Sequence, residues 1–401
     1  MAVANGFGKV VTSGSVFMYD VGDTYNSYLG EPTTNVFKHY GTTGQGSAAD
    51  NAVNFDIQGT TGFIRLGYGQ TFGGYTIQPN DVVYKYNLGS NGCHYHGNTV
   101  TIPSGKYATF SFDYYVSPGT TIENSYLANF ENYGGSALGG GVSAPNSLTG
   151  VWQTVTLTLG PTGGSGTQAM FLYPGGCGPR FGNTGYILYK NPQVEFLPHK
   201  TPFTQTSRSV SGSLLPLIGN STIDLSNVSF DSNAQMVFDG TNDYINIPSS
   251  NVFDIQTVTV EVIVKPYSTS QNGFWFEKGA VNTQYSLFME GSNIVWRTAY
   301  GGTYDSMYFG SSNMTANAWN HVVGTYTAGD KRVYLNSTLM NSNGLNVTLN
   351  TNQGNQYIGS YNSNGYFYNG EIAVVKVYNR VLTASEITQN YNKYKTRFNL
   401  S

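Results

Sequence analysis

Short runs in which apolar and polar side chains alternate recur along this chain, and turn residues separate them. Two clear examples are residues 258–264 (VTVEVIV) and 107–116 (YATFSFDYYV). Successive side chains of a β-strand point to opposite faces, so a period of two is typical of a half-buried strand. Pro-Gly, Gly-Gly and Asn-Gly breaks follow such runs at similar spacing, which favours antiparallel β-sandwiches.

Composition supports an all-β fold. The 401 residues include 50 Gly, 32 Tyr and 22 Phe, and only 10% are charged. Strands joined by tight turns favour Tyr, Val, Thr, Gly and Asn, whereas helices favour residues that are scarce here. One short helix is expected near the end, where Thr383 or Ser385 can cap it and Glu386 has capping-box spacing from Thr383. Ile387 and Tyr391 would then pack this helix onto the body of its domain.

The length suggests two to three domains. We predict two tandem sandwiches, both antiparallel jelly rolls, at 46–203 and 213–401, joined by a polar linker at 204–212 and preceded by an extended N-terminal arm at 1–45. The arm contains one strand candidate, Ser15–Asp20. In an alternative arrangement this strand pairs with the second sandwich, and the first sandwich is then an insertion.

Several classes of partner are disfavoured. A net charge of −3 gives no basic footprint for nucleic acid. No apolar run approaches the ~20 residues needed to cross a membrane, and the first 14 residues contain no apolar core of a signal peptide. A protein that acts outside a cell would then leave by another route, such as assembly into a virus particle released by lysis.

Two cysteines, Cys93 and Cys177, are too few for a disulfide framework. With His94 and His96 they could form a zinc site, or they could pair as a disulfide. Surface histidines with buried thiols are the simpler interpretation, and the sequence leaves the pairing open.

The last 190 residues or so contain a series of motifs in a fixed order. They are FDGTNDYI (238–245), WNHVVGTY (319–326), YLNS (334–337), Ile358-Gly359 and GEIAVVKVYNRVLTASEI (370–387). This series resembles the laminin-G-like domains of the concanavalin A-like lectin/glucanase superfamily. The resemblance implies a sandwich closed by a late strand and a short helix. Ser337 stands where the family has a turn glycine, so we expect a wider or differently twisted turn there.

The segment YILYKNPQVEFLPHKTPFTQTSRS (186–209) carries a second resemblance. It is similar to the last strand and exit loop of carbohydrate-binding-module-like jelly rolls in phage tail and head-fibre proteins. This resemblance implies a virion location and partners among capsid or tail proteins.

Aromatic residues in Gly/Asn/Ser-rich surroundings are the candidates for glycan binding, because sugar rings stack on aromatic faces. They are Trp275, Trp296, Tyr300 and Tyr304. Core packing is the alternative for each of them.

Asp239 and Asp243 are candidate calcium ligands, because some members of the superfamily hold calcium and loop carboxylates suit this ion. The alternative is turn chemistry, in which both side chains accept backbone N–H bonds. No cofactor other than this calcium ion is expected.

Catalysis is not expected. Glycosidases of this fold place two carboxylates at alternating positions of one strand, and the chain has no E-x-D-x-E pattern, no G-x-S-x-G and no H-E-x-x-H.

We therefore predict a non-catalytic structural or adhesive protein of a bacteriophage particle, namely a capsid decoration, head fibre or tail fibre. It would be a symmetric homo-oligomer that could also bind a cell-surface glycan. The alternatives are a bacterial glycan-binding lectin and, less favoured, a glycoside hydrolase.

Overall fold

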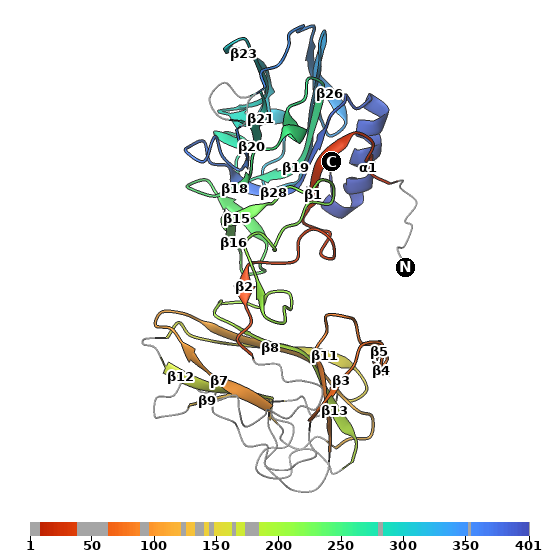
Figure 1. Cartoon of the computed structure of the whole chain (residues 1–401), viewed down its shortest axis with the longest axis vertical. Helices are drawn as coiled ribbons and strands as arrows, with labels where there is room; N and C mark the ends of the chain where they lie inside the picture. Colours follow the sequence, from red (N-terminus) through yellow and green to blue (C-terminus); the bar gives the residue numbers. More distant parts are fainter. Residues whose placement is uncertain are drawn as a thin grey trace. The chain divides into compact units, whose positions relative to one another are not determined.

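The computed structural model describes residues 9–37, 63–88, 96–121, 126–132, 140–143, 148–162, 166–172, 184–279, 284–351 and 354–400. These residues form antiparallel β-sheets, two short 3-10 turns and one C-terminal α-helix (Figure 1), which confirms the all-β prediction. The described part contains no helix that is long and apolar enough to span a membrane. The chain divides into two compact units. Unit 1 comprises Met1–Pro32, Ser209–Asp231 and Gln235–Ser401, and unit 2 comprises Thr33–Arg208 with Ser232–Ala234.

Unit 1 is a sandwich of two sheets whose inner faces share one apolar core. The eight-stranded sheet has the order β16-β17-β28-β19-β24-β25-β26, with β1 also paired to β28. Its strands are β1 (Ser15–Asp20), β16 (Ser229–Phe230), β17 (Met236–Asp239), β19 (Val258–Pro266), β24 (Asn320–Thr327), β25 (Asp330–Leu335), β26 (Thr338–Asn343) and β28 (Asn369–Tyr378).

The seven-stranded sheet has the order β15-β18-β27-β20-β21-β22-β23. Its strands are β15 (Asp224–Asn227), β18 (Tyr244–Ile247), β20 (Gly273–Lys278), β21 (Tyr285–Glu290), β22 (Asn293–Tyr300), β23 (Thr303–Gly310) and β27 (Gln356–Ile358), and the 3-10 turns are η1 (Asn251–Phe253) and η2 (Ser311–Asn313).

The strand near the N-terminus belongs to unit 1, so the predicted arm at 1–45 and the tandem order are wrong. β1 pairs antiparallel with β28, from Ser15 opposite Tyr378 to Asp20 opposite Val374. Phe17 on this strand is fully buried in the core of unit 1. The local pattern predicts the strand but carries no information about a partner more than 350 residues away, which is why sequence reasoning left the pairing open. Unit 2 is therefore an insertion between β1 and the rest of unit 1.

Unit 2 contains a five-stranded and a four-stranded sheet around its own core. The chain enters through β2 and leaves through β14, which pair with each other, so part of the predicted linker is a strand. The strands are β2 (Thr33–Thr34), β3 (Phe63–Leu66), β4 (Thr71–Phe72), β5 (Tyr75–Thr76), β6 (Val83–Asn87), β7 (His96–Ile102), β8 (Ala108–Val116), β9 (Tyr126–Asn132), β10 (Gly140–Ser143), β11 (Trp152–Leu159), β12 (Gly166–Leu172), β13 (Tyr186–Glu195) and β14 (Ser207–Arg208).

The segment 186–209 supplies part of the contact between the strands through which the chain enters and leaves unit 2. Glu195 is fully buried, and its two carboxylate oxygens accept hydrogen bonds from the Thr33 hydroxyl at 2.9 Å and from the Thr201 amide at 2.7 Å. Arg208 donates to the Thr201 hydroxyl at 3.1 Å. Residues of this segment thus form hydrogen bonds with Thr33 of β2 and with Arg208 of β14, which gives them a structural role.

The turn at Asn336-Ser337 is tight, in contrast to the expectation of a wider one. Both residues have left-handed backbones, with φ of 47° and 66°, and Leu335 pairs with Thr338 across them. Two left-handed residues define the two-residue hairpin turn that matches strand twist, so serine takes the place of glycine without a change in loop length.

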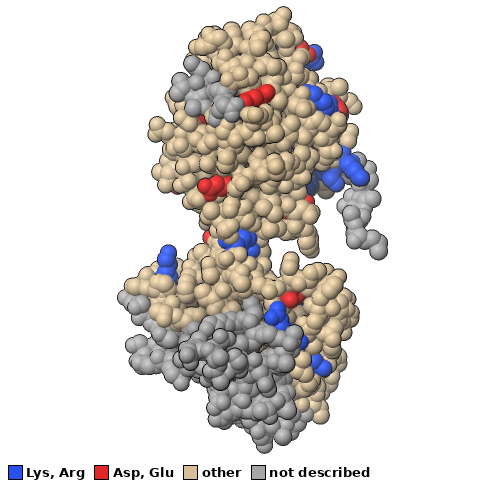
Figure 2. All heavy atoms as spheres, viewed as in Figure 1, with Lys and Arg blue, Asp and Glu red and all other residues tan. Residues whose placement is uncertain are grey.

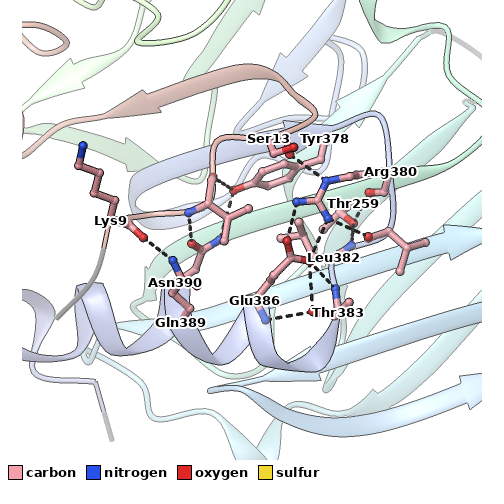
Figure 3. Close-up of polar contacts among 12 residues, drawn as sticks. Lys9, Ser13, Thr259, Tyr378, Arg380, Leu382, Thr383, Glu386, Gln389 and Asn390 are labelled. Atoms are coloured by element: carbon pink, nitrogen blue, oxygen red, sulfur yellow. Dashed lines mark hydrogen bonds and ion pairs between the residues drawn. The ribbon is translucent and has the colours of Figure 1, made fainter.

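The helix α1 (Ala384–Phe398) begins as predicted. Thr383 is its N-cap, and Thr383 and Glu386 form both hydrogen bonds of a capping box. The segment Lys9–Ser13 lies along this helix and along the end of β28 (Figure 3). The Val11 amide donates to Asn390 at 2.7 Å, and Gln389 donates to the Lys9 carbonyl at 2.6 Å.

A buried polar network lies beneath α1. Lys376 donates to one oxygen of Glu261 at 3.0 Å, and Asn390 donates to the other at 2.7 Å. His321 Nε2 lies 3.0 Å from the first oxygen, and the Tyr378 hydroxyl donates to the second at 3.3 Å. Burial raises the pKa of Glu261, but Lys376 and His321 outweigh this effect and hold it at about 2.

Replacing the N-cap should cost a modest part of the stability. Thr383→Ala is expected to lower the free energy of unfolding by about 1 kcal/mol, because the first turn of α1 loses its side-chain acceptor. Urea unfolding measures the change. Ser385→Ala is the control, expected within about 0.5 kcal/mol of the wild type, and equal losses in the two variants would contradict the capping role.

Candidate functional site

A row of polar side chains crosses the outer face of the seven-stranded sheet. Glu277 on β20 pairs across the sheet with Ser286 on β21. Ser286 pairs in turn with Arg297 on β22, and Arg297 pairs with Ser306 on β23. Their strand neighbours face the core, so alternation places these four side chains on the outside. The four residues are called the polar row below.

Aromatic rings flank the polar row. On one side Phe274 and Phe288 stack with centroids 4.2 Å apart and planes inclined by 2°. Tyr361 packs on Phe274 at 5.3 Å, and its ring meets Tyr366 edge-on at 6.1 Å. On the other side lies Tyr304, whose side chain is 52% exposed. Phe274 and Phe288 are themselves buried, as are Glu277 and Ser286 of the polar row. The face therefore presents the exposed rings of Tyr304 and Tyr366, together with the partly exposed side chains of Tyr361, Arg297 and Ser306.

Arg297 lies at the centre of this face. Its Cζ atom is 4.6 Å from the Phe288 ring centroid and 4.5 Å from that of Tyr304. Its Nε donates to the Ser306 hydroxyl at 3.0 Å. Within the described residues no carboxylate forms an ion pair with this guanidinium, and its two Nη groups have no hydrogen-bond partner. The cation is thus held in place by two rings and one hydroxyl.

Glu277 is fully buried next to this arginine. Its Oε2 accepts the Asn362 backbone N–H at 2.6 Å, whereas Oε1 and the neighbouring Ser286 hydroxyl have no partner in the described part of the chain. Burial raises the pKa of Glu277 to about 8, against the smaller opposing effects of the Asn362 N–H and Arg297. The carboxyl group is therefore mostly protonated at pH 7 and leaves the charge of Arg297 uncompensated.

The loop after β27 supplies the Asn362 N–H. Asn362 and Ser363 have left-handed backbones, with φ of 49° and 55°. Asparagine tolerates this conformation better than most residues. The Asn/Ser/Gly sequence of this loop therefore fits its role of bringing a backbone donor over the sheet.

Two of the predicted glycan-binding residues do not lie on this face. Trp275 and Trp296 are fully buried in the core of unit 1, where no sugar can stack on them. Trp296 donates to the Thr325 carbonyl at 3.0 Å. A bulge between Phe274 and Phe276 turns Trp275 inward, and sequence alternation cannot reveal such a bulge.

The two predicted tyrosines have different environments. Tyr304 is exposed and borders Arg297. Tyr300 ends β22 on the same side of the strand as Trp296 and is partly buried. Sequence reasoning missed Glu277, Ser286, Arg297 and Phe288, because only strand register brings them together. The one available signal was that Arg297 is the only charged residue of β22.

The carboxylates of Asp239 and Asp243 serve the turn between β17 and β18. Asp239 accepts the Thr241 amide at 2.7 Å. Asp243 accepts the Asp239 amide at 2.9 Å and the Ser229 hydroxyl at 3.1 Å. Burial raises the pKa of Asp243. These contacts match the turn interpretation, and the described residues contain no group of three or more His, Cys, Asp or Glu placed to hold a metal.

The predicted cysteine and histidine cluster falls mostly outside the part of the chain that the structure describes. Cys93, His94 and Cys177 lie outside the described residues, and His96 is described only through the backbone of β7.

A comparison with known protein families supports this fold in unit 1. Residues 239–388 match the family model of the concanavalin A-like lectin/glucanases superfamily, which confirms the resemblance in unit 1. No curated protein matches the chain.

Among solved structures, the chain is similar to the binding domain of botulinum neurotoxin serotype G, with 19% identity, a TM-score of 0.39, and coverage of 45% of this chain and 48% of that one. It is also similar to the receptor binding domain of botulinum neurotoxin D, with 16% identity, a TM-score of 0.38, and coverage of 47% and 52%. The chain thus spans about half the length of these domains, and at this similarity its function has to be argued from its own residues.

Proposed function

We propose that this chain is a non-catalytic, lectin-like adhesion protein that binds glycans on the outer face of the seven-stranded sheet. The observation that carries the proposal is the pair of exposed rings, Tyr304 and Tyr366, that flank the partly exposed end of the polar row at Arg297 and Ser306. Sugar rings have apolar C–H faces and polar edges, so a surface that alternates aromatic rings with hydrogen-bond donors complements them. The match of unit 1 to a lectin-containing superfamily supports it, although a fold alone does not fix a function.

Broad electrostatic attraction is a poor alternative. Charged side chains are sparse on the face of the molecule drawn in Figure 2, as expected for a chain with 10% charged residues. Recognition would then depend on individual sites such as the polar row.

The surroundings of Glu277 favour binding over hydrolysis. A glycosidase needs a second carboxylate within about 10 Å of the first. The cross-strand neighbours of Glu277 are Ser286 and Tyr357. Glu290 lies four residues along β21 from Ser286, which is about 13 Å at the usual rise of a strand. Its carboxylate accepts a hydrogen bond from the Tyr308 hydroxyl at 3.1 Å.

Tyr304→Ala is expected to weaken glycan binding about fivefold, because the face loses an exposed ring worth about 1 kcal/mol. Stability should change by less than about 0.5 kcal/mol, because the ring is half exposed. A glycan array finds the ligand, and calorimetry then measures the affinity. Tyr25→Ala, which removes a tyrosine that is 90% exposed and lies outside this face, is the matched control. No binding at millimolar sugar, or equal losses in both variants, would overturn the proposal.

A bacteriophage particle is the setting that we propose for this protein, with capsid or tail proteins as partners and a symmetric homo-oligomer as the assembled form. The resemblance at 186–209 supports this setting. Mass spectrometry of purified virions tests it, and native mass measurement tests the oligomer. Absence from the particles would favour a bacterial lectin instead.

A further inference from the structure

We infer that the glycan bound by this face is acidic, and that Arg297 holds its carboxylate. The inference rests on the proposed function and names the class of ligand for the same site. It follows from the state of Arg297 and of the polar groups beside it.

The geometry of Arg297 leaves its anion-binding edge available. Phe288 and Tyr304 lie within 4.6 Å and 4.5 Å of Cζ, and Ser306 occupies Nε. The Nη1 and Nη2 groups remain, and this pair of donors matches a planar carboxylate in a bidentate arrangement. Since two rings and one hydroxyl already fix the side chain, binding costs little further loss of side-chain entropy.

The charge around Arg297 also favours an anion. The titratable groups beside Glu277 are Arg297 on β22, Tyr361 on the loop after β27 and the cross-strand neighbour Tyr357 on β27. Burial raises the pKa of Tyr361, so this phenol is neutral. With Glu277 protonated, the site carries the single positive charge of the guanidinium. A neutral sugar would leave this charge without a partner, whereas a sugar carboxylate supplies one.

Glu277 acts through Arg297 and is therefore a positioning residue. Its side chain is fully buried, so the ligand contacts the partly exposed arginine. While Glu277 is neutral, Arg297 is available to the ligand. When Glu277 ionises, the new negative charge repels a sugar carboxylate and competes for the guanidinium. Binding of acidic sugars should therefore weaken as the pH rises through about 8.

The test uses the full chain and pairs of sugars that differ in charge. Oligogalacturonates are compared with their methyl esters, and sialyllactose with lactose, by calorimetry at pH 7. We expect at least one acidic member to bind tenfold or more tightly than its neutral partner. Arg297→Gln should abolish this preference, and Arg297→Lys should retain only part of it, because lysine keeps the charge but loses the paired donors. Arg332→Gln is the control, since Arg332 is an exposed arginine of the other sheet that is paired with Asp330.

A pH series separates the role of Glu277 from simple packing. For the wild type, affinity for the acidic sugar should fall about tenfold between pH 7 and pH 9. Glu277→Gln, an isostere of the protonated form, should keep the affinity found at pH 7 and remove this dependence. Circular dichroism at each pH confirms that the variants are folded.

The outcomes distinguish the inference from the proposed function. Equal binding of acidic and neutral sugars would overturn the inference and leave glycan binding in place. A preference for sulfated heparin fragments over every carboxylated sugar would also overturn it. If no sugar of any kind binds, the inference and the proposed function both fail.

Discussion

Joining Pro32 to Ser209 through a short glycine-serine linker should give a unit 1 that folds alone, whereas a chain that starts at Ser209 should not fold. The linker can be short because Thr33 and Arg208 are paired strand residues, whose Cα atoms lie about 5 Å apart. The truncated chain loses β1 and with it Phe17 and Tyr19, which are fully buried. Burying two such rings contributes about 2 to 3 kcal/mol each. Together with the strand pairing, this is a large part of the roughly 5 to 15 kcal/mol that stabilises a domain.

Circular dichroism and urea unfolding of the two chains measure this difference. Adding a synthetic peptide of residues 9–32 to the truncated chain should restore part of its structure. A truncated chain that unfolds cooperatively at the same urea concentration as the linked one would show that β1 is dispensable. Unfolding of the linked chain without urea would show that unit 1 depends on unit 2.

Glu261→Gln should lower the free energy of unfolding by about 3 to 5 kcal/mol, because it leaves the buried Lys376 without its counter-charge. Glu371→Gln is the matched control. Glu371 also pairs with a lysine, Lys265, but both side chains are partly exposed, so this change should cost about 1 kcal/mol or less. Urea unfolding at pH 7 compares them, and equal losses would contradict a special role for the buried network.

The same network predicts a pH dependence. The pKa of Glu261 lies at about 2 in the folded protein, against an ordinary value of 4.5. The contribution of the ionised carboxylate is therefore present above pH 4.5 and is lost as the pH falls from 4.5 towards 2. Glu261→Gln should lack this part of the acid sensitivity. Unfolding curves measured between pH 2 and pH 7 report it.

Local features of the fold could be predicted from the sequence. Alternating runs gave strands close to their observed positions, for example Val258–Pro266, and Thr383 with Glu386 gave the start of the helix. Both depend on interactions between residues near one another in the chain. The partner of Ser15–Asp20 could not be found in this way, because strand pairing over hundreds of residues leaves no local pattern.

The site was harder to predict for the same reason. Tyr304 could be proposed from its type and surroundings, but Trp275 and Trp296 have the same appearance in the sequence and are core residues. Glu277 and Arg297 come together only through the register of β20, β21 and β22. Without that register neither the raised pKa of Glu277 nor the unpaired state of Arg297 can be inferred.

The pairing of β1 with β28 has a consequence for synthesis on the ribosome. Residues 15–20 emerge early, but their partner at 374–378 emerges only after all of unit 2 has been made. Domains made first generally fold first during translation, so unit 2 is expected to fold before β28 has been synthesised. During that time β1 has no partner strand, and its aromatic side chains are exposed to chaperones. Release of the nascent chain before Tyr378 would leave this strand without a place to dock, and proteases would remove the product.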